Sequence, residues 1–339
     1  MTEGPLSRVA ILDLTDERGI YGAKLLADLG AKVYRPEPLT GDPLRMRGPF
    51  IQNKGQNKES IWHAYFCSSR QSISLDLDSA MGIEQLELLL MKVDIVLTCS
   101  GAFGVDASKK ILSDKNIEDL IFIDTCSFRP GCEWEDYQAP DIVAAALGGQ
   151  LATTGDADTA PLKNFGELNF MVSGAYTAIS ALSALYNRRS TGSGQNAEVS
   201  VHECIASCLE HVFMFYWYGE AMERPEGKVL PRRGSLHWSN AYHVMNAKTG
   251  SIMITPTPDF DKQLTWMIEE NIHEDLIDPK YLEPENDRLR VEKTMKQLRD
   301  WVATKNAEDL FFEAQERHMP YGLISVSYTH LTLPTNREV

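Results

Sequence analysis

Short apolar runs alternate with amphipathic segments along the first 125 residues of the chain. Buried strands are predicted for the apolar runs at residues 9–14, 31–34, 72–77, 93–97 and 120–124. Helical spacing at residues 21–29 and 80–90 predicts helices, and Gly30 is placed to cap the first of them. Because strand, helix and strand follow one another with short connections, we expect an α/β domain with an open parallel sheet.

The stretch between residues 141 and 201 is rich in glycine and other small residues. Residues 173–186 predict a helix whose Gly, Ala and Ser residues let another backbone approach closely. Basic residues and glycines at 187–194 predict its end, and alternation over 196–201 predicts a half-buried strand. We expect the glycine turns around this helix and strand to form the edge of an active site.

A second domain is predicted after a charged segment punctuated by proline and glycine, residues 223–234, which is typical of a linker. Residues 242–254 predict a β-hairpin with a Lys-Thr-Gly turn. Residues 264–272 and 291–304 predict helices.

These patterns predict the domain organisation. We expect a large domain at residues 1–222, and a linker with a small α+β domain at residues 223–324. The final residues, 325–339, continue neither the helical nor the strand pattern, and we expect them to be a non-native tail.

The net charge and the apolar runs of the chain indicate which partners and which cell compartment to expect. The 339 residues carry a formal net charge of -15, whereas phosphate-backbone binding needs a basic surface, so we expect no nucleic-acid partner. The first residues lack the basic and apolar regions of a signal peptide. No uninterrupted apolar run approaches the roughly 18 residues of a membrane span. These features predict a soluble, cytoplasmic protein with no membrane segment.

Two kinds of cofactor motif are missing from the sequence. The turn after the first strand reads Thr15-Asp-Glu-Arg-Gly19 rather than GxGxxG, so a nicotinamide or flavin cofactor has weak support. The six cysteines form no CxxC pair and no metal-ligand pattern with histidine. We therefore expect buried thiols and no metal.

Several short motifs occur in an order that is typical of one family. They are Leu12-Asp-Leu-Thr15, Leu26–Val33, Pro36-Glu37, Gly41-Asp42, Arg45, Arg70–Leu77, the strand of Asp94, Ala146–Gly149, Thr154-Gly155, Pro161 and Thr191–Gln195. No single motif decides, but the ordered set resembles the class III CoA-transferase family. That family includes formyl-CoA transferase and the carnitine and bile-acid CoA-transferases, and the resemblance covers residues 1–324.

The resemblance implies a Rossmann-like large domain, a smaller α+β domain and two subunits interlocked as rings. It implies transfer of coenzyme A from an acyl-CoA to a carboxylic acid, with these small molecules as partners and no metal. In the family an aspartate attacks the thioester and passes through a mixed anhydride to an aspartyl-CoA thioester. Backbone amides of nearby glycines stabilise the oxyanion. We expect a homodimer, or a heteromer with an active paralogue.

The nucleophile that the resemblance implies is replaced in this chain. The family places its aspartate four residues before the first glycine of the small-residue helix; that glycine is Gly174 here, and the position holds Phe170. The 2-methylacyl-CoA racemase branch has its acid one residue earlier, where this chain has Asn169. Glu167 is the acid just ahead of these positions.

Three interpretations follow from this replacement. Glu167 could supply the carboxylate from a shifted loop, although catalysis tolerates only about 1 Å of displacement. The chain could be a non-catalytic subunit beside an active paralogue, since loss of a nucleophile costs on the order of 10³ to 10⁶ in rate. It could also act on CoA esters by other chemistry, as a racemase-like protein does, or merely bind them.

Binding of coenzyme A needs cations for the phosphates and an apolar slot for adenine. The resemblance implies that Glu37, Arg45 and Arg70 belong to the coenzyme A site. Arg129 is close to a position that is basic in the family.

Two further residue pairs that the resemblance implies are replaced in this chain, and the expected substrate contacts are weak. A Glu-Asn pair of the family is Thr98-Cys99 here, and its basic-plus-tyrosine pair corresponds to Cys126 and Phe128. Weak substrate contacts are expected from His237, Trp238 and Tyr242.

Overall fold

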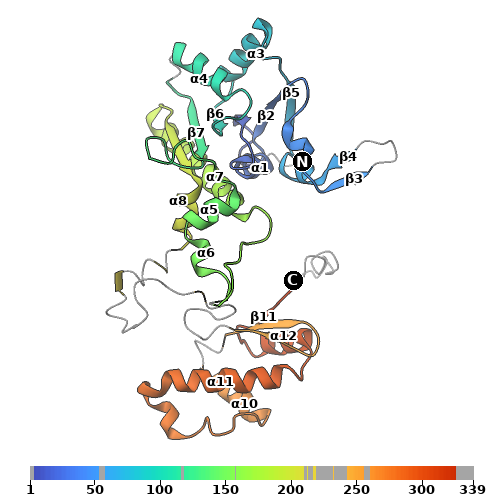
Figure 1. Cartoon of the computed structure of the whole chain (residues 1–339), viewed down its shortest axis with the longest axis vertical. Coiled ribbons are helices and arrows are strands. Elements are labelled where there is room, and N and C mark those ends of the chain that lie inside the picture. Colours follow the sequence, from blue (N-terminus) through green and yellow to red (C-terminus); the bar gives the residue numbers. More distant parts are fainter. Residues whose placement is uncertain are drawn as a thin grey trace. The chain divides into compact units, whose positions relative to one another are not determined.

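The chain, described here as a computed structural model, divides into two compact units (Figure 1). The large unit comprises residues 1–152 and 162–230, and the small unit comprises residues 153–161 and 231–339. The structure describes residues 4–52, 58–115, 118–156, 158–209, 212, 217–218, 232, 243–255 and 260–325. The expected domain boundary, nearly all of the expected linker and most of the expected tail lie outside the described residues.

The large unit is built on a six-stranded parallel sheet. Its strands lie in the order β5-β2-β1-β6-β7-β8, and each neighbouring pair is parallel. Their bounds are β1 (Ala10–Leu14), β2 (Lys32–Glu37), β5 (Arg70–Ser74), β6 (Ile95–Thr98), β7 (Ile121–Cys126) and β8 (Asn196–Ser200). All six correspond to predicted strands, and their order is that of a Rossmann-like doubly wound sheet. The predicted fold class is confirmed.

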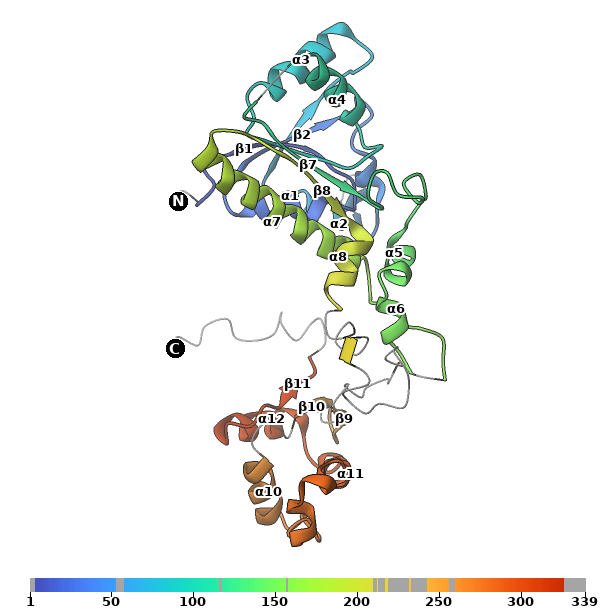
Figure 2. The ribbon, with the colours of Figure 1, turned by 90° about the vertical axis from the view of Figure 1, so that its left-hand side faces the viewer.

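Helices cover both faces of this sheet (Figure 2). On one face lie α1 (Ile20–Asp28) and α7 (Leu168–Thr191), and on the other lie α3 (Ala80–Leu90) and α4 (Val105–Asp114). The pleat of β1 explains the two layers, because neighbouring strand residues point to opposite faces. Ile11 packs in the core beside α1 and α7, whereas Leu12 packs in the core beside α3 and α4.

The helix α7 packs against α1 through glycine. A Cβ added to Gly174 would lie 2.7 Å from Cβ of Tyr21 and 2.8 Å from the nitrogen of Gly22. The close backbone approach predicted for the small-residue helix is therefore confirmed. Its predicted start at residue 173 is wrong, because α7 begins at Leu168.

Among the described helices, α7 alone is long and apolar enough to cross a bilayer. Its buried face contacts α1, β7 and α8 (Val201–Ser207). The apolar character of α7 is therefore explained by its place in the core of the large unit.

The hydrophobic pattern does not predict several short elements of the large unit, because each spans only one or two helical turns or a few paired residues. They are η1 (Pro43–Met46), β3 (Phe50–Gln52), β4 (Lys58–Ser60), α2 (Ile61–Phe66), α5 (Asp141–Leu147) and α6 (Gln150–Thr153). Polar caps define two of them: Asp42 accepts a hydrogen bond from the Leu44 amide at η1, and Ser60 accepts one from the His63 amide at α2.

The small unit holds a three-stranded antiparallel sheet with helices. Its strands are β9 (His243–Asn246), β10 (Ser251–Ile254) and β11 (Gly322–Leu323), and its helices are α10 (Phe260–Glu269), η2 (Pro279–Leu282), η3 (Pro284–Asn286), α11 (Asp287–Val302) and α12 (Ala307–Glu316). The pairing of β9 with β10 confirms the predicted hairpin. Trp266 forms the centre of this core, in edge contact with Trp301 at 5.2 Å and stacked on Tyr321 at 5.5 Å between ring centroids.

The glycine contact between α1 and α7 predicts a large effect of Gly174→Val on stability. The added side chain meets the backbone of α1, so we expect the free energy of unfolding to fall by at least about 2 kcal/mol. Ser183→Val, at an exposed position of the same helix, is the control and should change it by less than about 0.5 kcal/mol. Urea unfolding followed by circular dichroism measures both, and equal effects would refute the close contact.

Candidate active site

The strand order of the large unit reverses between β1 and β6, because β2 continues on one side of β1 and β6 on the other. Ligands of such sheets bind outside the carboxyl ends of the strands at this switch point. Two cavities lie there. We name them the β1–β2 pocket, of about 220 Å³, and the α7 pocket, of about 580 Å³.

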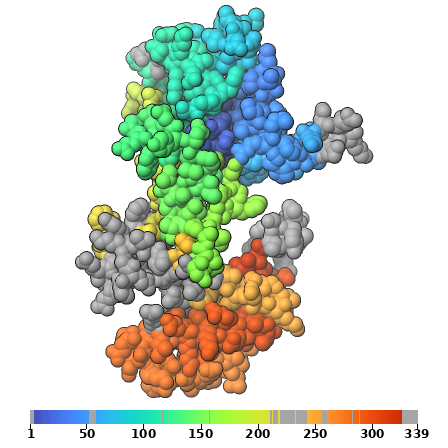
Figure 3. Space-filling view, viewed as in Figure 1, coloured from blue at the N-terminus to red at the C-terminus, as the bar shows by residue number. Residues whose placement is uncertain are grey.

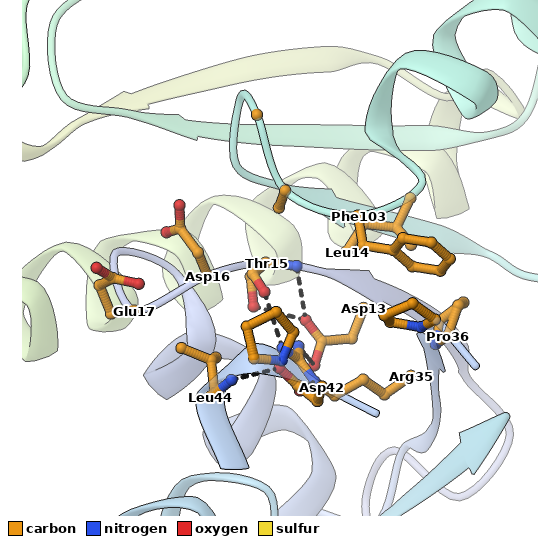
Figure 4. Close-up of a pocket in the computed structure, with 14 residues that line it drawn as sticks. Asp13, Leu14, Thr15, Asp16, Glu17, Arg35, Pro36, Asp42, Leu44 and Phe103 are labelled. Carbon is orange, nitrogen blue, oxygen red and sulfur yellow. Dashed lines mark hydrogen bonds and ion pairs between the residues drawn. The ribbon is translucent and has the colours of Figure 1, made fainter. Parts of the chain in front are cut away.

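The β1–β2 pocket has a charged floor and an apolar side (Figure 4). The Arg35 guanidinium donates to Asp13 at 3.0 Å, to Asp42 at 2.6 Å and to the carbonyl of Thr15 at 3.1 Å. Its apolar lining includes Leu14, Pro36, Pro38, Pro43, Leu44 and Phe103. The pocket can therefore accept a flat apolar ring beside groups that hydrogen-bond.

The Asp13 carboxylate is wholly buried at the end of the central strand. Burial disfavours its charge, but the guanidinium groups of Arg70 and Arg35 outweigh burial and keep the pKa of Asp13 below its ordinary value. Arg70 also donates to the carbonyls of Ile20 and Phe66, each at 2.6 Å, and its side chain is 1% exposed. Arg70, a predicted ligand residue, thus binds protein groups and is not among the residues that line the pocket.

Glu37 and Arg45 form an ion pair at the rim of this network. Glu37 is buried and accepts hydrogen bonds from Arg45 at 2.6 and 2.9 Å, from the Asp42 amide at 2.9 Å and from the Ser72 hydroxyl. Burial opposes its charge, but these donors lower the pKa of Glu37 to about 2. The side chain of Arg45 is 47% exposed, so its guanidinium can also meet a ligand.

Arg129, the fourth predicted coenzyme A residue, is exposed in the loop after β7. That loop is green in Figure 3 and lies on the surface of the large unit. The structure thus leaves two of the four predicted residues, Arg45 and Arg129, open to solvent, and buries Glu37 and Arg70 within the protein.

The α7 pocket is lined by residues that follow β1 and β6, by the end of β7 and the residues after it, by residues 135–141 and by the start of α7. Its lining is acidic, with one arginine, Arg18, and six acids: Asp16, Glu17, Glu135, Asp136, Asp141 and Glu167. Arg18 donates to both oxygens of Asp16 and to the carbonyl of Ser100 at 2.7 Å. Burial opposes the charge of Arg18, but hydrogen bonds with Asp16 raise its pKa above the ordinary value. This cation was not singled out by the sequence analysis.

Asp141 anchors the first turn of α7. Its carboxylate accepts hydrogen bonds from the amides of Asn169 at 3.0 Å and Phe170 at 3.2 Å, and from the Asn169 side chain at 2.9 Å. Lys163 lies 2.9 Å away and balances the charge. These amides have no partner within the helix, and an anion is favoured at its N-terminus. Asp141 is a site residue that sequence reasoning did not assign, although an acid just after Pro140 at a helix start is a visible signal.

The structure places Asn169 and Phe170 inside the first turn of α7 rather than in a preceding loop. Phe170 is 5% exposed and forms an apolar cluster with Ala144, Val201 and Ile205. Asn169 is 1% exposed. Both positions where the resemblance implies an acid are therefore filled by buried, uncharged side chains.

Glu167 directly precedes the first residue of α7 and lines the α7 pocket. Its carboxylate forms an ion pair with Arg47, whose guanidinium stacks on Trp62 with 4.5 Å to the ring centroid. The predicted candidate carboxylate thus lies in the pocket wall, already paired with a cation.

The positions where the resemblance implies a Glu-Asn pair and a basic-plus-tyrosine pair are buried at the ends of β6 and β7 or just after them. Thr98 donates to the Asp124 carboxylate at 2.7 Å, and Cys99 has no exposed surface. Burial raises the pKa of the Cys126 thiol to about 12, and the Phe128 ring packs 5.1 Å from His202. The remaining predicted contacts, His237, Trp238 and Tyr242, lie outside the described residues.

Removal of the Asp13 charge should destabilise the large unit strongly. Asp13→Asn leaves the buried guanidinium groups of Arg35 and Arg70 without their shared anion, which costs about 3 to 5 kcal/mol. Asp28→Asn removes an exposed carboxylate paired with Lys24 and should cost less than about 0.5 kcal/mol. Unfolding in urea compares the two, and a small effect of Asp13→Asn would contradict the central role of this carboxylate.

The lowered pKa of Glu37 predicts acid sensitivity. Because the folded pKa lies below the unfolded value of roughly 4.3, the charge stabilises the fold above that pH, and the gain is lost as pH falls toward 2. We expect Glu37→Gln to lower the free energy of unfolding by about 2 kcal/mol at pH 7, less than the full pKa difference because solvent screens part of the ion pair. The difference from the unaltered chain should shrink by half or more at pH 3. A difference independent of pH in urea titrations would exclude this linkage.

Comparison with known proteins gives the same family over nearly the whole chain. The profile described as CoA-transferase family III matches residues 6–338. Subunit BbsE of succinyl-CoA:(R)-benzylsuccinate CoA-transferase from Thauera aromatica is 29% identical over 240 residues, 70% of this chain and 57% of that protein. Succinyl-CoA:mesaconate CoA-transferase from Haloarcula hispanica is 27% identical over 321 residues, 91% of this chain and 77% of that protein. The chain thus matches little more than half of the length of the first relative.

A solved structure has the same fold. A CAIB/BAIF family protein from Brucella suis matches with a TM-score of 0.80 at 23% identity, covering 98% of this chain and 87% of that chain. The likeness concerns the fold, and it agrees with the doubly wound sheet and the two units described above. With the family profile matched from residue 6 to residue 338, the chain belongs to CoA-transferase family III.

Proposed function

We propose that this chain is a subunit of a CoA-transferase that binds CoA thioesters without forming the covalent aspartyl intermediate itself. A paralogous chain with an intact aspartate would supply that step. The observation that carries this proposal is the buried Phe170 ring at the position of the family's nucleophile.

The covalent route needs a carboxylate oxygen that can reach the thioester carbonyl. The side chain at position 170 is instead an apolar ring packed on Ala144, Val201 and Ile205. Its neighbour Asn169 uses its amide group to bind Asp141. Neither residue offers a nucleophilic oxygen, and loss of a nucleophile costs on the order of 10³ to 10⁶ in rate.

Asp141 is a poor replacement for the lost aspartate. Its oxygens accept three hydrogen bonds from Asn169 and Phe170 and pair with Lys163. Attack on a thioester would remove the charge that these donors hold in place. We therefore assign Asp141 to positioning the start of α7 rather than to chemistry.

Binding of coenzyme A is supported by the β1–β2 pocket. Phe103 and Pro36 provide a flat apolar side for adenine (Figure 4), and Arg45 offers a half-exposed guanidinium nearby for a phosphate. Arg129 is a further exposed cation of the same unit. Both pockets contain acids, but the α7 pocket has the larger excess, six acids against one arginine, so the thioester end rather than the nucleotide end is assigned there.

The partner chain follows from the missing nucleophile. A chain that binds the thioester without attacking it needs a second active site to be useful in transfer. BbsE, one of its relatives, is named as a subunit of a CoA-transferase. We propose a heteromer here, in preference to a homodimer, which would contain no aspartate at either copy of position 170.

Glu167 supports a second candidate function, transfer of coenzyme A by this chain alone. Its carboxylate lines the α7 pocket just ahead of α7, and the helix N-terminus favours an anion there. The ion pair with Arg47 would have to open before Glu167 could attack a thioester.

Intact-mass analysis of the purified chain with succinyl-CoA separates the two functions. We expect coenzyme A to bind by calorimetry, with no covalent acyl or CoA adduct on the protein. Phe103→Ala should weaken binding at least about fivefold through loss of stacking. Phe312→Ala, an exposed ring in the small unit, should leave binding unchanged.

An adduct on the chain alone would overturn the inert-subunit proposal. If Glu167→Gln abolishes that adduct while Glu17→Gln, in the same pocket, retains it, Glu167 is the nucleophile. Absence of coenzyme A binding would overturn both functions. In the heteromer, transfer should require a family member with an intact aspartate and proceed normally with Glu167→Gln in this chain.

A further inference from the structure

Three side chains of types that bind metal ions gather beside the β1–β2 pocket. Asp42 caps η1, while His63 and Cys67 lie one helical turn apart on and just after α2. Their carboxylate, imidazole and thiol atoms all lie within 4.8 Å of one another. We propose that Asp42, His63 and Cys67 form a metal site that takes a divalent transition-metal ion, with zinc the best match.

The imidazole of His63 gives the first support. Its Nε2 atom is buried and has no hydrogen-bond partner among the described residues, although buried polar atoms are normally paired. The nearest carboxylate oxygen, Oδ2 of Asp42, is 3.8 Å away, beyond hydrogen-bond distance. Tetrahedral zinc bonds of about 2.1 Å separate two such ligand atoms by about 3.4 Å. A shift of a few tenths of an ångström would therefore let an ion bridge them.

The ligand set and its spacing give the second support. Thiolate, imidazole and carboxylate together are a ligand set that zinc accepts, and softer or harder ions match it less well. Residues four apart on a helix present their side chains on one face, as in helical zinc motifs. The Cys67 amide donates to the His63 carbonyl at 2.8 Å, so the helical turn between these ligands is already formed. Three protein ligands leave the fourth position for water.

The charges around the proposed metal site balance one another before an ion binds. The guanidinium of Arg35 lies 2.6 Å from Asp42 and opposes a cation. The adjoining network contains equal numbers of opposite charges, with carboxylates at Asp13, Glu37 and Asp42 and guanidinium groups at Arg35, Arg45 and Arg70. Binding of a divalent ion with release of the Cys67 proton adds one net positive charge.

The thiol must lose its proton to bind metal. Binding of the ion therefore releases the thiol proton, in agreement with the net charge counted above.

Three protein ligands with a water in the fourth position form an open zinc site, and it is the place of the site, beside the β1–β2 pocket rather than at α7, that assigns the ion a structural role. Asp42 and Arg35 both line the β1–β2 pocket, and His63 and Cys67 come from the neighbouring α2. An ion held by all three ligands would tie α2 to the segment after β2. It would thus hold the wall of the pocket in place without taking part in the reaction at α7.

Zinc binding by the full chain tests the site. After treatment with chelator, the chain is titrated with Zn²⁺ alone, and metal content and thermal unfolding are measured. We expect one zinc per chain and a rise in melting temperature. Cys67→Ser and His63→Ala should each lower affinity at least about 100-fold, since even residues that only orient metal ligands contribute 10- to 100-fold. Cys208→Ser alters an exposed cysteine of the large unit and should bind like the unaltered chain.

The outcomes separate a specific site from incidental binding. Zinc binding that survives Cys67→Ser, or that Cys208→Ser abolishes, would overturn the proposal. If the ligand variants do not fold, Co²⁺ bound to the Cys208→Ser chain decides, because a cobalt–thiolate bond absorbs strongly in the near ultraviolet. Absence of that absorption would exclude Cys67 as a ligand, whereas loss of coenzyme A binding would bear only on the function proposed above.

Discussion

The buried carboxylate of Asp13 is the interaction on which the site of the large unit depends. It lies one residue before the end of the central strand β1 and binds two guanidinium groups, Arg35 from β2 and Arg70 from β5. Three segments that are distant in sequence, β1, β2 and β5, thus meet at one buried anion, and Arg35 also binds Asp42. Such a network adds little net stability over apolar packing, but loss of one member leaves the other charges unpaired. The position of the pocket is therefore fixed by a group of charges, and substitution of any one of them leaves its partners unpaired.

The strands of the sheet could be predicted because their information is local. An apolar run that ends in a turn signals a buried strand, and α3 was predicted with the bounds it has in the structure. The start of α7 could not be predicted in this way. Its first turn is held by Asp141, which is 28 residues distant from Asn169 in sequence. Residues 168–172 also lack the glycine and alanine pattern that marks the rest of the helix.

For the site, the sequence indicated residue types but not their partners. Counting back from Gly174 identified Asn169 and Phe170, yet only the fold reveals that both are buried. Glu37 and Arg70 were expected at the coenzyme A site because the resemblance implies it, and whether a charge meets a ligand or another side chain depends on residues far along the chain. The same applies to the proposed metal site. The spacing of His63 and Cys67 carries meaning only once α2 is known to be a helix, and Asp42 joins them through tertiary structure.

At the N-terminus of α7, one residue anchors the helix and another occupies the position where the resemblance implies the reactive carboxylate. Asp141 satisfies the free amides of the helix, so the helix start needs no carboxylate at position 170 to be stable. Phe170 can then contribute apolar packing among α5, α7 and α8, where burial of such a ring is worth about 1.5 to 3 kcal/mol. The β1–β2 pocket is held by the Asp13 network and does not draw on position 170 at all. Binding surfaces can thus persist after the reactive group is gone, and this separation is what makes a thioester-binding subunit physically reasonable.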